Sequence, residues 1–383
     1  MKFSVIGAGG VGQVIARHLA KVGSVNVGDI DRESLREVAK MSGEISTSRL
    51  NAGSPDQVRR LIKGSDAIIN ASNPRFNLLI MKQALRSGVN YIDLAGDNLL
   101  SVEEQMKQSP KWKKAGLVAI LGMGEDPGLS NIMARQATDT LDAVSEIRIR
   151  DGETSTSETY PFVALFAPDV FLEEAVSPAR YFENGEMKTN PPLSGRELYK
   201  FPLPLGEVPL YGMDHEEVHS LPEYLPKKPK FVDFKLALTD EAASAIKLFQ
   251  GLGLLSRKPI AVGKVKVSPL SVLLRLLPAP SKIAGKIHGS AGILVEAKGQ
   301  ISGQPYSEKL YAMMTHDDAF KKYQTNATSY LTGTPTAVCA KMLGEGRIDD
   351  RGVIVPEMLN AQPFIEEAKN FDLRVQIEKV RLQ

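Results

Sequence analysis

The stretch that decides the fold is Phe3-Ser4-Val5-Ile6-Gly7-Ala8-Gly9-Gly10-Val11-Gly12. Its first four residues form a short apolar run bounded by glycine, which predicts a buried β-strand. Apolar residues at helical spacing follow from Val11 to Val22. Between the two segments lies a G-x-G-x-x-G pattern, which in a strand–turn–helix context predicts a dinucleotide-binding turn.

Each residue of this turn has an expected task. Gly7 permits the tight turn, Gly9 lets a pyrophosphate approach the backbone, and Gly12 lets the helix pack closely on the strand. The first turn of the helix contains Gly10 and Val11. Its unpaired N–H groups and its positive dipole end would hold the phosphates.

An acidic residue follows at the end of the second expected strand. Asp29 comes about 20 residues after the turn, where a carboxylate accepts hydrogen bonds from the adenosine ribose. It would repel a 2′-phosphate, so we expect NAD. The cofactor site should also include Ile30 and Arg32, and Arg32 could accommodate a phosphate, which leaves NADP open.

Strand-like and helix-like segments alternate through the first 125 residues, which indicates βαβ units and a parallel sheet. Ligands of such sheets bind outside the carboxyl ends of the strands. The residues expected there to contact the cofactor are Asn51, Ala71, Ser72, Asn73 and Gly124.

The middle of the chain has a different pattern. Runs such as Val144–Ile149, Lys230–Leu238 and Gly292–Gly299 alternate along a mostly antiparallel sheet with polar outer faces. The end becomes helical again over residues 328–343, with an expected break at Gly333-Thr334-Pro335, and 374–380 alternates like a closing strand.

Composition excludes several function classes. The 383 residues are 43% hydrophobic and 24% charged, with a net charge of +2, which gives no case for nucleic-acid or membrane binding. The single cysteine, Cys339, excludes an intramolecular disulfide and a cysteine-type zinc cluster, and we expect no metal. No segment has the pattern of a signal peptide or a membrane span, so we expect a cytoplasmic protein.

Several longer motifs together resemble one family. The sequence resembles the saccharopine dehydrogenase-like family, which includes saccharopine reductases, lysine 6-dehydrogenases and carboxynorspermidine dehydrogenases. The resemblance rests on Ile69–Pro74, Tyr91–Asp97, Asp126–Asn131, Gly206–Leu225, Gly333–Ala337 and Gly352–Glu357.

The resemblance implies an α/β protein with a Rossmann doubly wound parallel sheet and an inserted α+β substrate domain. Residues 1–125 plus 326–383 would form the NAD(P)-binding domain, and 126–325 the substrate-binding and dimerisation domain. The activity implied is an NAD(P)-dependent oxidoreductase that acts on a C–N bond of a small amino-acid substrate, as in saccharopine or L-lysine dehydrogenases. A homodimer is expected.

One segment departs from the family pattern. Saccharopine reductases carry an arginine for a substrate carboxylate early in the substrate domain, whereas this chain has Phe166-Ala167-Pro168-Asp169. The departure favours a lysine-like or polyamine-like substrate, whose ammonium would prefer an acid. A carboxynorspermidine-type imine reductase and a non-catalytic NAD-sensing protein remain alternatives.

Release of hydride from an amine needs a base that takes the amine proton. His215 is the first candidate because its acidic neighbours could position it, although it could also be a surface histidine in an acidic loop. Asp126 is the rival, in a loop that should border the nicotinamide. His18 is expected to be solvated on the polar side of the first helix.

Three further residues are expected on the substrate side. Arg75 could hold an α-carboxylate by a bidentate contact, with an exposed turn arginine as the alternative. Asn73 and Asp93 lie at the ends of neighbouring expected strands, although Asp93 could be structural or bind ribose instead.

Overall fold

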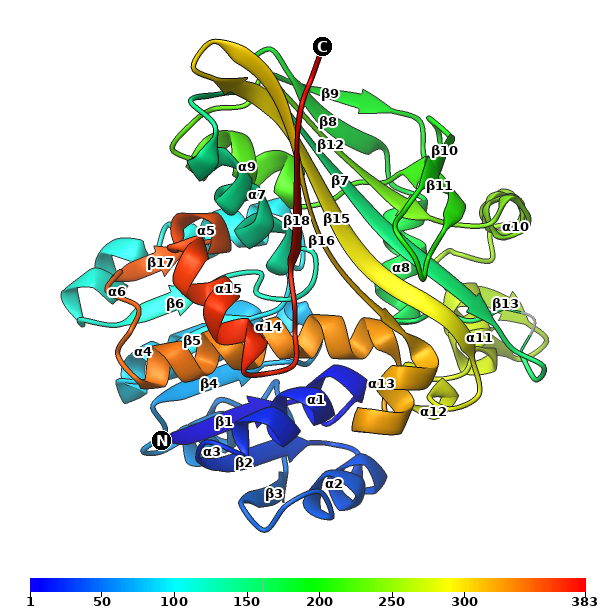
Figure 1. Ribbon diagram of the computed structural model, residues 1–383. Helices are drawn as coiled ribbons and strands as arrows, with labels where there is room; N and C mark the ends of the chain where they lie inside the picture. Colours follow the sequence, from blue (N-terminus) through cyan, green and yellow to red (C-terminus); the bar gives the residue numbers. More distant parts are fainter. Residues whose placement is uncertain (161) are drawn as a thin grey trace.

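The computed structural model describes residues 1–160 and 162–383. Two β-sheets dominate it: a parallel sheet lies low in Figure 1, and a long twisted mixed sheet rises above it. Helix α14 (Ala327–Gly344) lies between them, in contact with both α1 of the first sheet's layer and β15 of the second sheet. The functional residues are therefore to be sought where the two sheets meet.

The parallel sheet has the order β3-β2-β1-β4-β5-β6-β17, and every pair in it is parallel. The strand order reverses between β1 and β4, which is the topological switch point where such folds bind dinucleotides. The expected Rossmann sheet is confirmed. Its strands are β1 (Lys2–Ile6), β2 (Ser24–Asp29), β3 (Ile45–Arg49), β4 (Ala67–Asn70), β5 (Asn90–Asp93), β6 (Val118–Ile120) and β17 (Gly352–Ile354).

Helices connect these strands. Two of them, α5 and α6, lie between β5 and β6, where the sequence pattern gave no helix; Asn98 begins α5 by accepting a hydrogen bond from the Ser101 N–H at 3.0 Å. The helices are α1 (Gly10–Leu19), α2 (Arg32–Ala39), α3 (Pro55–Ile62), α4 (Asn77–Ser87), α5 (Leu99–Met106) and α6 (Ser109–Lys114), with the 3₁₀ turn η1 (Pro74–Phe76).

The second sheet has the order β10-β11-β12-β7-β15-β16-β18, with β8 paired to β12 and β9 to β8. Only β7 and β12 run parallel among the described pairs, so the expected mostly antiparallel sheet is confirmed. The strands are β7 (Ala143–Thr156), β8 (Ala179–Glu183), β9 (Glu186–Asn190), β10 (Glu197–Lys200), β11 (Glu207–Gly212), β12 (Phe231–Ala237), β15 (His288–Ile301), β16 (Gln304–Thr315) and β18 (Gln376–Arg381).

The remaining elements surround this sheet. A small hairpin, β13 (Ile260–Val262) and β14 (Val265–Val267), stands apart from it. The helices are α7 (Leu129–Thr140), α8 (Pro168–Ala175), α9 (Glu217–Tyr224), α10 (Asp240–Gly251), α11 (Pro269–Leu276), α12 (Pro280–Ile283), α13 (His316–Tyr323) and α15 (Ala361–Lys369), with the 3₁₀ turn η2 (Pro356–Met358).

Helix α14 is continuous, so the predicted break at Gly333-Thr334-Pro335 is wrong. Tertiary packing holds the helix together: Gly333 lies so close to α1 that an added Cβ would be 2.8 Å from the Val14 Cβ. The Thr336 hydroxyl donates to the Met123 carbonyl at 2.5 Å. These contacts outweigh the loss of one backbone donor at a buried proline.

The C-terminal segment divides between the two sheets. Strand β17 pairs with β6 in the parallel sheet, as expected, but β18 pairs with β16 in the mixed sheet. The assignment of all of residues 326–383 to the nucleotide domain is therefore corrected, because β16 presents an edge on which β18 adds antiparallel.

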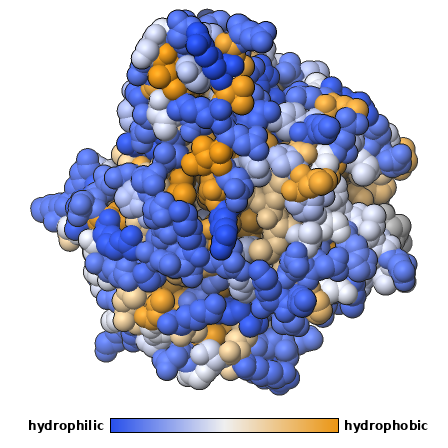
Figure 2. All heavy atoms as spheres, in the orientation of Figure 1, coloured by the Kyte–Doolittle hydropathy of each residue, from blue (hydrophilic) through white to orange (hydrophobic). Residues whose placement is uncertain are grey.

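The molecular surface seen in Figure 2 is mostly hydrophilic, with separate apolar patches. No described helix is sufficiently long and apolar for a membrane span.

Candidate active site

The glycine turn is built by close backbone packing. Gly7 has φ +109°, and an added Cβ would lie 2.4 Å from the Ala71 carbonyl oxygen. At Gly12 an added Cβ would lie 2.1 Å from the Gly7 carbonyl oxygen. Both positions therefore need glycine for the turn to exist, which draws β1, α1 and the end of β4 together.

Gly9, which lies between these two glycines in the sequence, has a different environment. An added Cβ at Gly9 would meet nothing within 4 Å, and no side chain caps the start of α1. The N–H groups of Gly10 and Val11 therefore begin the helix beside open space. This is the cradle that a pyrophosphate fits, with the helix dipole favouring its charge.

The acidic residue stands beside this cradle. Asp29 accepts hydrogen bonds from the Ala8 N–H at 2.6 Å and from the Asp31 N–H at 2.9 Å. A carboxylate has acceptor capacity beyond two such bonds, so it can also take a ribose hydroxyl. Ile30 is 61% exposed and Arg32 is exposed at the start of α2.

Other expected cofactor residues lie at the ends of β3 and β4. Asn51 is exposed and its side chain accepts the Gly53 N–H at 2.9 Å. Ser72 donates its hydroxyl to the Asn70 side chain at 2.6 Å, which fixes the backbone next to Gly7. The structure thus places Ala71 and Ser72 at the switch point, as the sequence predicts.

Two expected substrate residues follow β4. The Asn73 side chain accepts the Arg75 N–H at 3.1 Å and so begins η1. Arg75 is exposed, with its guanidinium 4.7 Å from the centre of the Phe76 ring. The carboxylate-binding role of Arg75 stays a prediction.

Asp93 is held in a buried hydrogen-bond network, which favours the structural alternative, and its contact with substrate stays a prediction. It is 1% exposed, and its carboxylate accepts the Gly122 N–H at 2.7 Å, the Gln105 side-chain amide at 2.8 Å and the Tyr91 hydroxyl at 2.9 Å. These bonds hold the exit of β6 against β5. Burial raises the pKa of Asp93 to about 6.

The loop after β6 is a tight turn that fixes the positions of two acidic residues, Glu125 and Asp126. The Gly124 N–H donates to the Pro127 carbonyl at 2.7 Å, and Gly128 has φ +132°, where a Cβ would lie 2.3 Å from the Gly124 oxygen. Gly128 is therefore required, and Glu125 and Asp126 project from a fixed backbone.

A cluster of carboxyls gathers around this loop from five segments of the chain. Burial is the main cause that raises the pKa of most of them: Glu153, Glu174 and Glu357 to about 7, and Glu216 to about 8. We call this set the acid cluster. It consists of Glu125 and Asp126 (loop after β6), Asp151 and Glu153 (β7), Glu174 (α8), Glu216 and Glu217 (α9 and its N-terminus) and Glu357 (η2).

His215 lies inside this cluster, so it is not a surface histidine. Its ring stacks on Phe234 with centroids 3.9 Å apart, and its Nδ1 is hydrogen bonded to Glu217. Glu217 also accepts the Ser130 hydroxyl at 2.7 Å. Burial disfavours a charged imidazole, but Glu217 and the neighbouring carboxyls Glu174 and Glu216 raise the pKa of His215 to about 10. His215 is therefore an imidazolium near neutral pH, which weakens its candidacy as the base.

The same side chains have the spacing of a metal-binding group. Ligand atoms of Asp126, His215 and Glu217 lie within 4.8 Å of one another. The imidazole is already hydrogen bonded to Glu217, whose other oxygen is held by Ser130. The group is thus arranged as an ion pair beside a carboxyl, not as three free ligands.

Sequence reasoning missed Asp151, Glu153, Glu174 and Glu357. A signal existed for the first two: they continue the alternation of Ile147 and Ile149 along β7 onto the buried face. Glu174 and Glu357 carried no such signal, because each is brought to the site by long-range packing alone.

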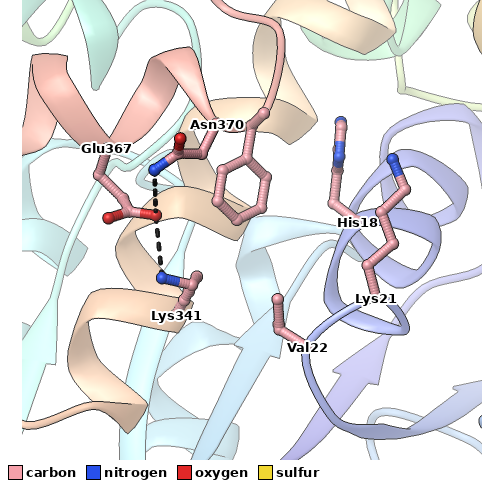
Figure 3. A pocket seen from close by; sticks show the side chains of 7 residues that line it. His18, Lys21, Val22, Lys341, Glu367 and Asn370 are labelled. Atoms are coloured by element: carbon pink, nitrogen blue, oxygen red, sulfur yellow. Dashed lines mark hydrogen bonds and ion pairs between the residues drawn. The ribbon is translucent and has the colours of Figure 1, made fainter.

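His18 is corrected from solvated to buried: it is 1% exposed among aromatic rings and bonded to Thr334 at 3.2 Å. Burial lowers its pKa to about 3. Figure 3 shows it beside a hollow of about 220 Å³ with Lys21, Val22, Lys341, Glu367 and Asn370. His18 is near the end of α1 opposite the glycine turn, so it lies outside the candidate site.

Comparisons with known proteins agree with this geometry. The saccharopine dehydrogenase NADP binding domain matches residues 3–120, and the saccharopine dehydrogenase C-terminal domain matches residues 124–371. Carboxynorspermidine synthase of Vibrio alginolyticus is 31% identical over 98% of this chain and 96% of its own. Carboxyaminopropylagmatine dehydrogenase of a Synechocystis species is 28% identical over 95% of this chain and 94% of its own.

A solved structure shows the same fold. The apo saccharopine dehydrogenase (L-Glu forming) of Saccharomyces cerevisiae has a TM-score of 0.72 at 15% identity, covering 99% of both chains. The two family models together span nearly the whole chain, as does the Vibrio relative. This chain therefore belongs to the saccharopine dehydrogenase family and is an NAD(P)-binding oxidoreductase.

Proposed function

We propose that the protein interconverts an imine and an amine at a C–N bond of a carboxylated, polyamine-type substrate. The observation that carries the proposal is the acid cluster. Among the described residues, no lysine or arginine forms an ion pair with its carboxyls, and the one ion pair that the cluster makes there is His215 with Glu217. A site with so many buried carboxyls favours a ligand with ammonium groups.

The names of the relatives support the same substrate class. Carboxynorspermidine and carboxyaminopropylagmatine are both carboxylated amines with further cationic nitrogens, and the two relatives match nearly the whole chain. The absence of the expected arginine near Phe166–Asp169 fits as well, since helix α8, which begins at Pro168, instead contributes Glu174, an acid near enough to His215 for their charges to interact. A lysine-type amino acid, which carries one distal ammonium, is the runner-up.

The chain's own residues supply binding and orientation. The cradle at Gly9 and the start of α1 would hold the pyrophosphate, and the loop from Gly124 to Gly128 would border the nicotinamide, which accepts or gives hydride when bound. The acid cluster would hold the substrate nitrogens so that the reacting carbon faces that ring.

We also propose that NAD is preferred to NADP. Asp29 lies where the adenosine ribose is expected, and Asp31 follows it at the start of α2. A 2′-phosphate would approach these two carboxylates. Two cations also lie near the start of that helix: Arg32, and Lys282, whose Nζ is 3.8 Å from the Glu33 carboxylate.

The test is a turnover screen in both directions. Carboxynorspermidine, carboxyaminopropylagmatine, saccharopine and L-lysine are offered with NAD or NADP, and absorbance of the reduced nicotinamide is followed. We expect the carboxylated polyamines to have the highest kcat/KM. Turnover of saccharopine or lysine at higher kcat/KM would overturn the proposed substrate class, and turnover of none, with cofactor bound, would overturn the proposed activity.

A further inference from the structure

One segment of the chain differs in charge from the rest. Residues 242–287 contain eight lysine and arginine residues and no aspartate or glutamate, whereas the whole chain has a net charge of +2. The remaining residues are therefore net acidic, and the balanced composition does not show this asymmetry. We call residues 242–287 the basic segment. Its cations are Lys247, Arg257, Lys258, Lys264, Lys266, Arg275, Lys282 and Lys286.

Most of these cations have no acidic partner. Arg257 pairs with Glu173 at 2.8 Å, and the Lys282 Nζ lies 3.8 Å from the Glu33 carboxylate. Among the described residues, none of the other six forms an ion pair, and all eight cations are exposed. The basic segment therefore presents uncompensated positive charge to its surroundings, which attracts an anionic partner.

The basic segment also exposes large aliphatic side chains on three elements, with exposed fractions from 48% to 77%. In each of the two helices these side chains are four residues apart, so they lie on one outward face. Figure 1 places α10, β13 and α11 one after another down the right-hand edge of the molecule. The side chains are Leu248 and Leu252 at the end of α10, Ile260, Val262 and Val265 in the hairpin, and Val272 and Leu276 on α11.

The hairpin combines both features. Val262 pairs with Val265 across the two strands, so these side chains and that of Ile260 stand on the same face. Lys266 stands on the opposite face, and Lys264 lies in the turn between the strands. An apolar face of this kind, bordered by cations, is typical of a surface that another body covers.

We propose that the basic segment docks on the surface of a membrane that contains anionic lipids. The aliphatic side chains would enter the boundary between headgroups and acyl chains, and the lysines and arginines would pair with the negative headgroups. A membrane surface offers apolar and negative character together, as the basic segment offers apolar and positive character together. The inference does not depend on the proposed function.

Two other occupants fit the basic segment less well. A second copy of the chain, in a two-fold dimer through this segment, would place the segment against itself, and its unpaired cations would repel their counterparts. A single-stranded nucleic acid stacks its bases on aromatic side chains. The only aromatic residue of the basic segment is Phe249, which is half-buried.

The test is co-sedimentation of the full chain with vesicles of phosphatidylcholine, either alone or mixed with phosphatidylserine. We expect the partition coefficient to be about 10-fold or more higher on the anionic vesicles. It should fall when the salt concentration rises from about 0.05 to 0.5 M, because salt screens the attraction.

Two double variants separate the charge from the apolar contact. Lys264→Glu with Lys266→Glu should lower the partition coefficient on anionic vesicles by about 10-fold or more. Val262→Ser with Val265→Ser leaves the charge unchanged and should also lower it, by about 10-fold, because less apolar surface enters the membrane. Thermal melting shows whether each variant is folded.

The matched controls carry the same changes elsewhere on the surface. They are Lys111→Glu with Lys114→Glu on α6, and Ile377→Ser with Val380→Ser, which are 48% and 58% exposed on β18. Both should bind vesicles as the wild type does. A loss of binding in the controls equal to that in the variants would overturn the inference.

Three further results would also overturn it. The first is a wild type that binds the anionic vesicles no better than phosphatidylcholine alone. The second is a dimer, seen in sedimentation velocity without vesicle binding, that Lys264→Glu with Lys266→Glu dissociates, which would assign the segment to a second copy. The third is binding to polyglutamate but not to anionic vesicles, which would assign it to an acidic protein.

Discussion

The two halves of the site are made in opposite ways. The nucleotide half is a backbone structure: Gly7, Gly9 and Gly12 lie within one short stretch, and their contacts are to main-chain atoms or to open space. The substrate half is a side-chain structure assembled from the loop after β6, β7, α8, α9 and η2. The nucleotide half depends on glycines, which have no Cβ atom, and the substrate half depends on buried charged side chains.

The largest expected effect comes from adding a methyl group to the backbone half. Gly7→Ala would force a Cβ to within 2.4 Å of the Ala71 oxygen at φ +109°. We expect a loss of about 2–4 kcal/mol in the free energy of unfolding and more than about 100-fold weaker cofactor binding. Denaturant unfolding and cofactor titration measure the two quantities.

Gly9→Ala is the matched control, because its Cβ would meet nothing within 4 Å. Its stability should stay within about 0.5 kcal/mol of the wild type, while a methyl group in the cradle weakens cofactor binding about 10-fold or more. Equal cofactor binding by Gly9→Ala and the wild type would contradict the cradle.

In the substrate half, the second largest effect is expected from Glu153→Gln. Its carboxyl accepts the Thr328 hydroxyl at 2.8 Å, and the amide would keep that bond but lose the charge. We expect KM for a polyammonium substrate to rise about 10-fold at pH 8, with cofactor affinity unchanged. Steady-state kinetics with saturating cofactor measure it.

Glu146→Gln tests whether a carboxylate elsewhere on β7, outside the acid cluster, also affects the KM of the substrate. Glu146 lies on the same strand but is paired with Arg148 and Lys298. The KM of this variant should equal that of the wild type. A similar rise in both variants would mean that overall charge, not the acid cluster, attracts the substrate.

The same contrast explains what the sequence could predict. The turn, the succession of parallel strands up to β6 and the place of Asp29 depend on local spacing, so they were predictable and are found where expected. The burial of His18 and the continuity of α14 depend on tertiary packing. Local sequence predicted the opposite, from the polar side of α1 in one case and from a proline in the other. His215 and Asp126 were singled out by their acidic or loop context, but Asp151 of the same acid cluster becomes visible only when β7 crosses the site.

A smaller effect is expected at the boundary of the nucleotide half. Asp29→Asn keeps acceptor capacity for the Ala8 N–H but removes the charge that opposes a 2′-phosphate. We expect the ratio of the NAD and NADP dissociation constants to shift by about five-fold toward NADP. Exposed Glu37→Gln on α2 serves as the control. An unchanged ratio would remove Asp29 from cofactor discrimination.

The smallest expected effect is a difference between the two halves in how ligand-induced stabilisation depends on pH. Glu153, Glu174 and Glu357 have pKa values raised from 4.5 to about 7, and Glu216 to about 8. Between pH 5 and 8 the folded state therefore holds more protons than the unfolded state. The stability of the free protein must then fall as pH rises through this window.

We expect Tm of the free protein to drop by roughly 5 °C between pH 5.5 and 8. A polyammonium ligand such as norspermidine should raise Tm more at pH 8 than at pH 6, because the ionised carboxyls then have a cation to pair with. Cofactor should raise Tm by a similar amount at both pH values, since its cradle is backbone. Equal pH dependence for the two ligands would show that the halves do not differ in kind.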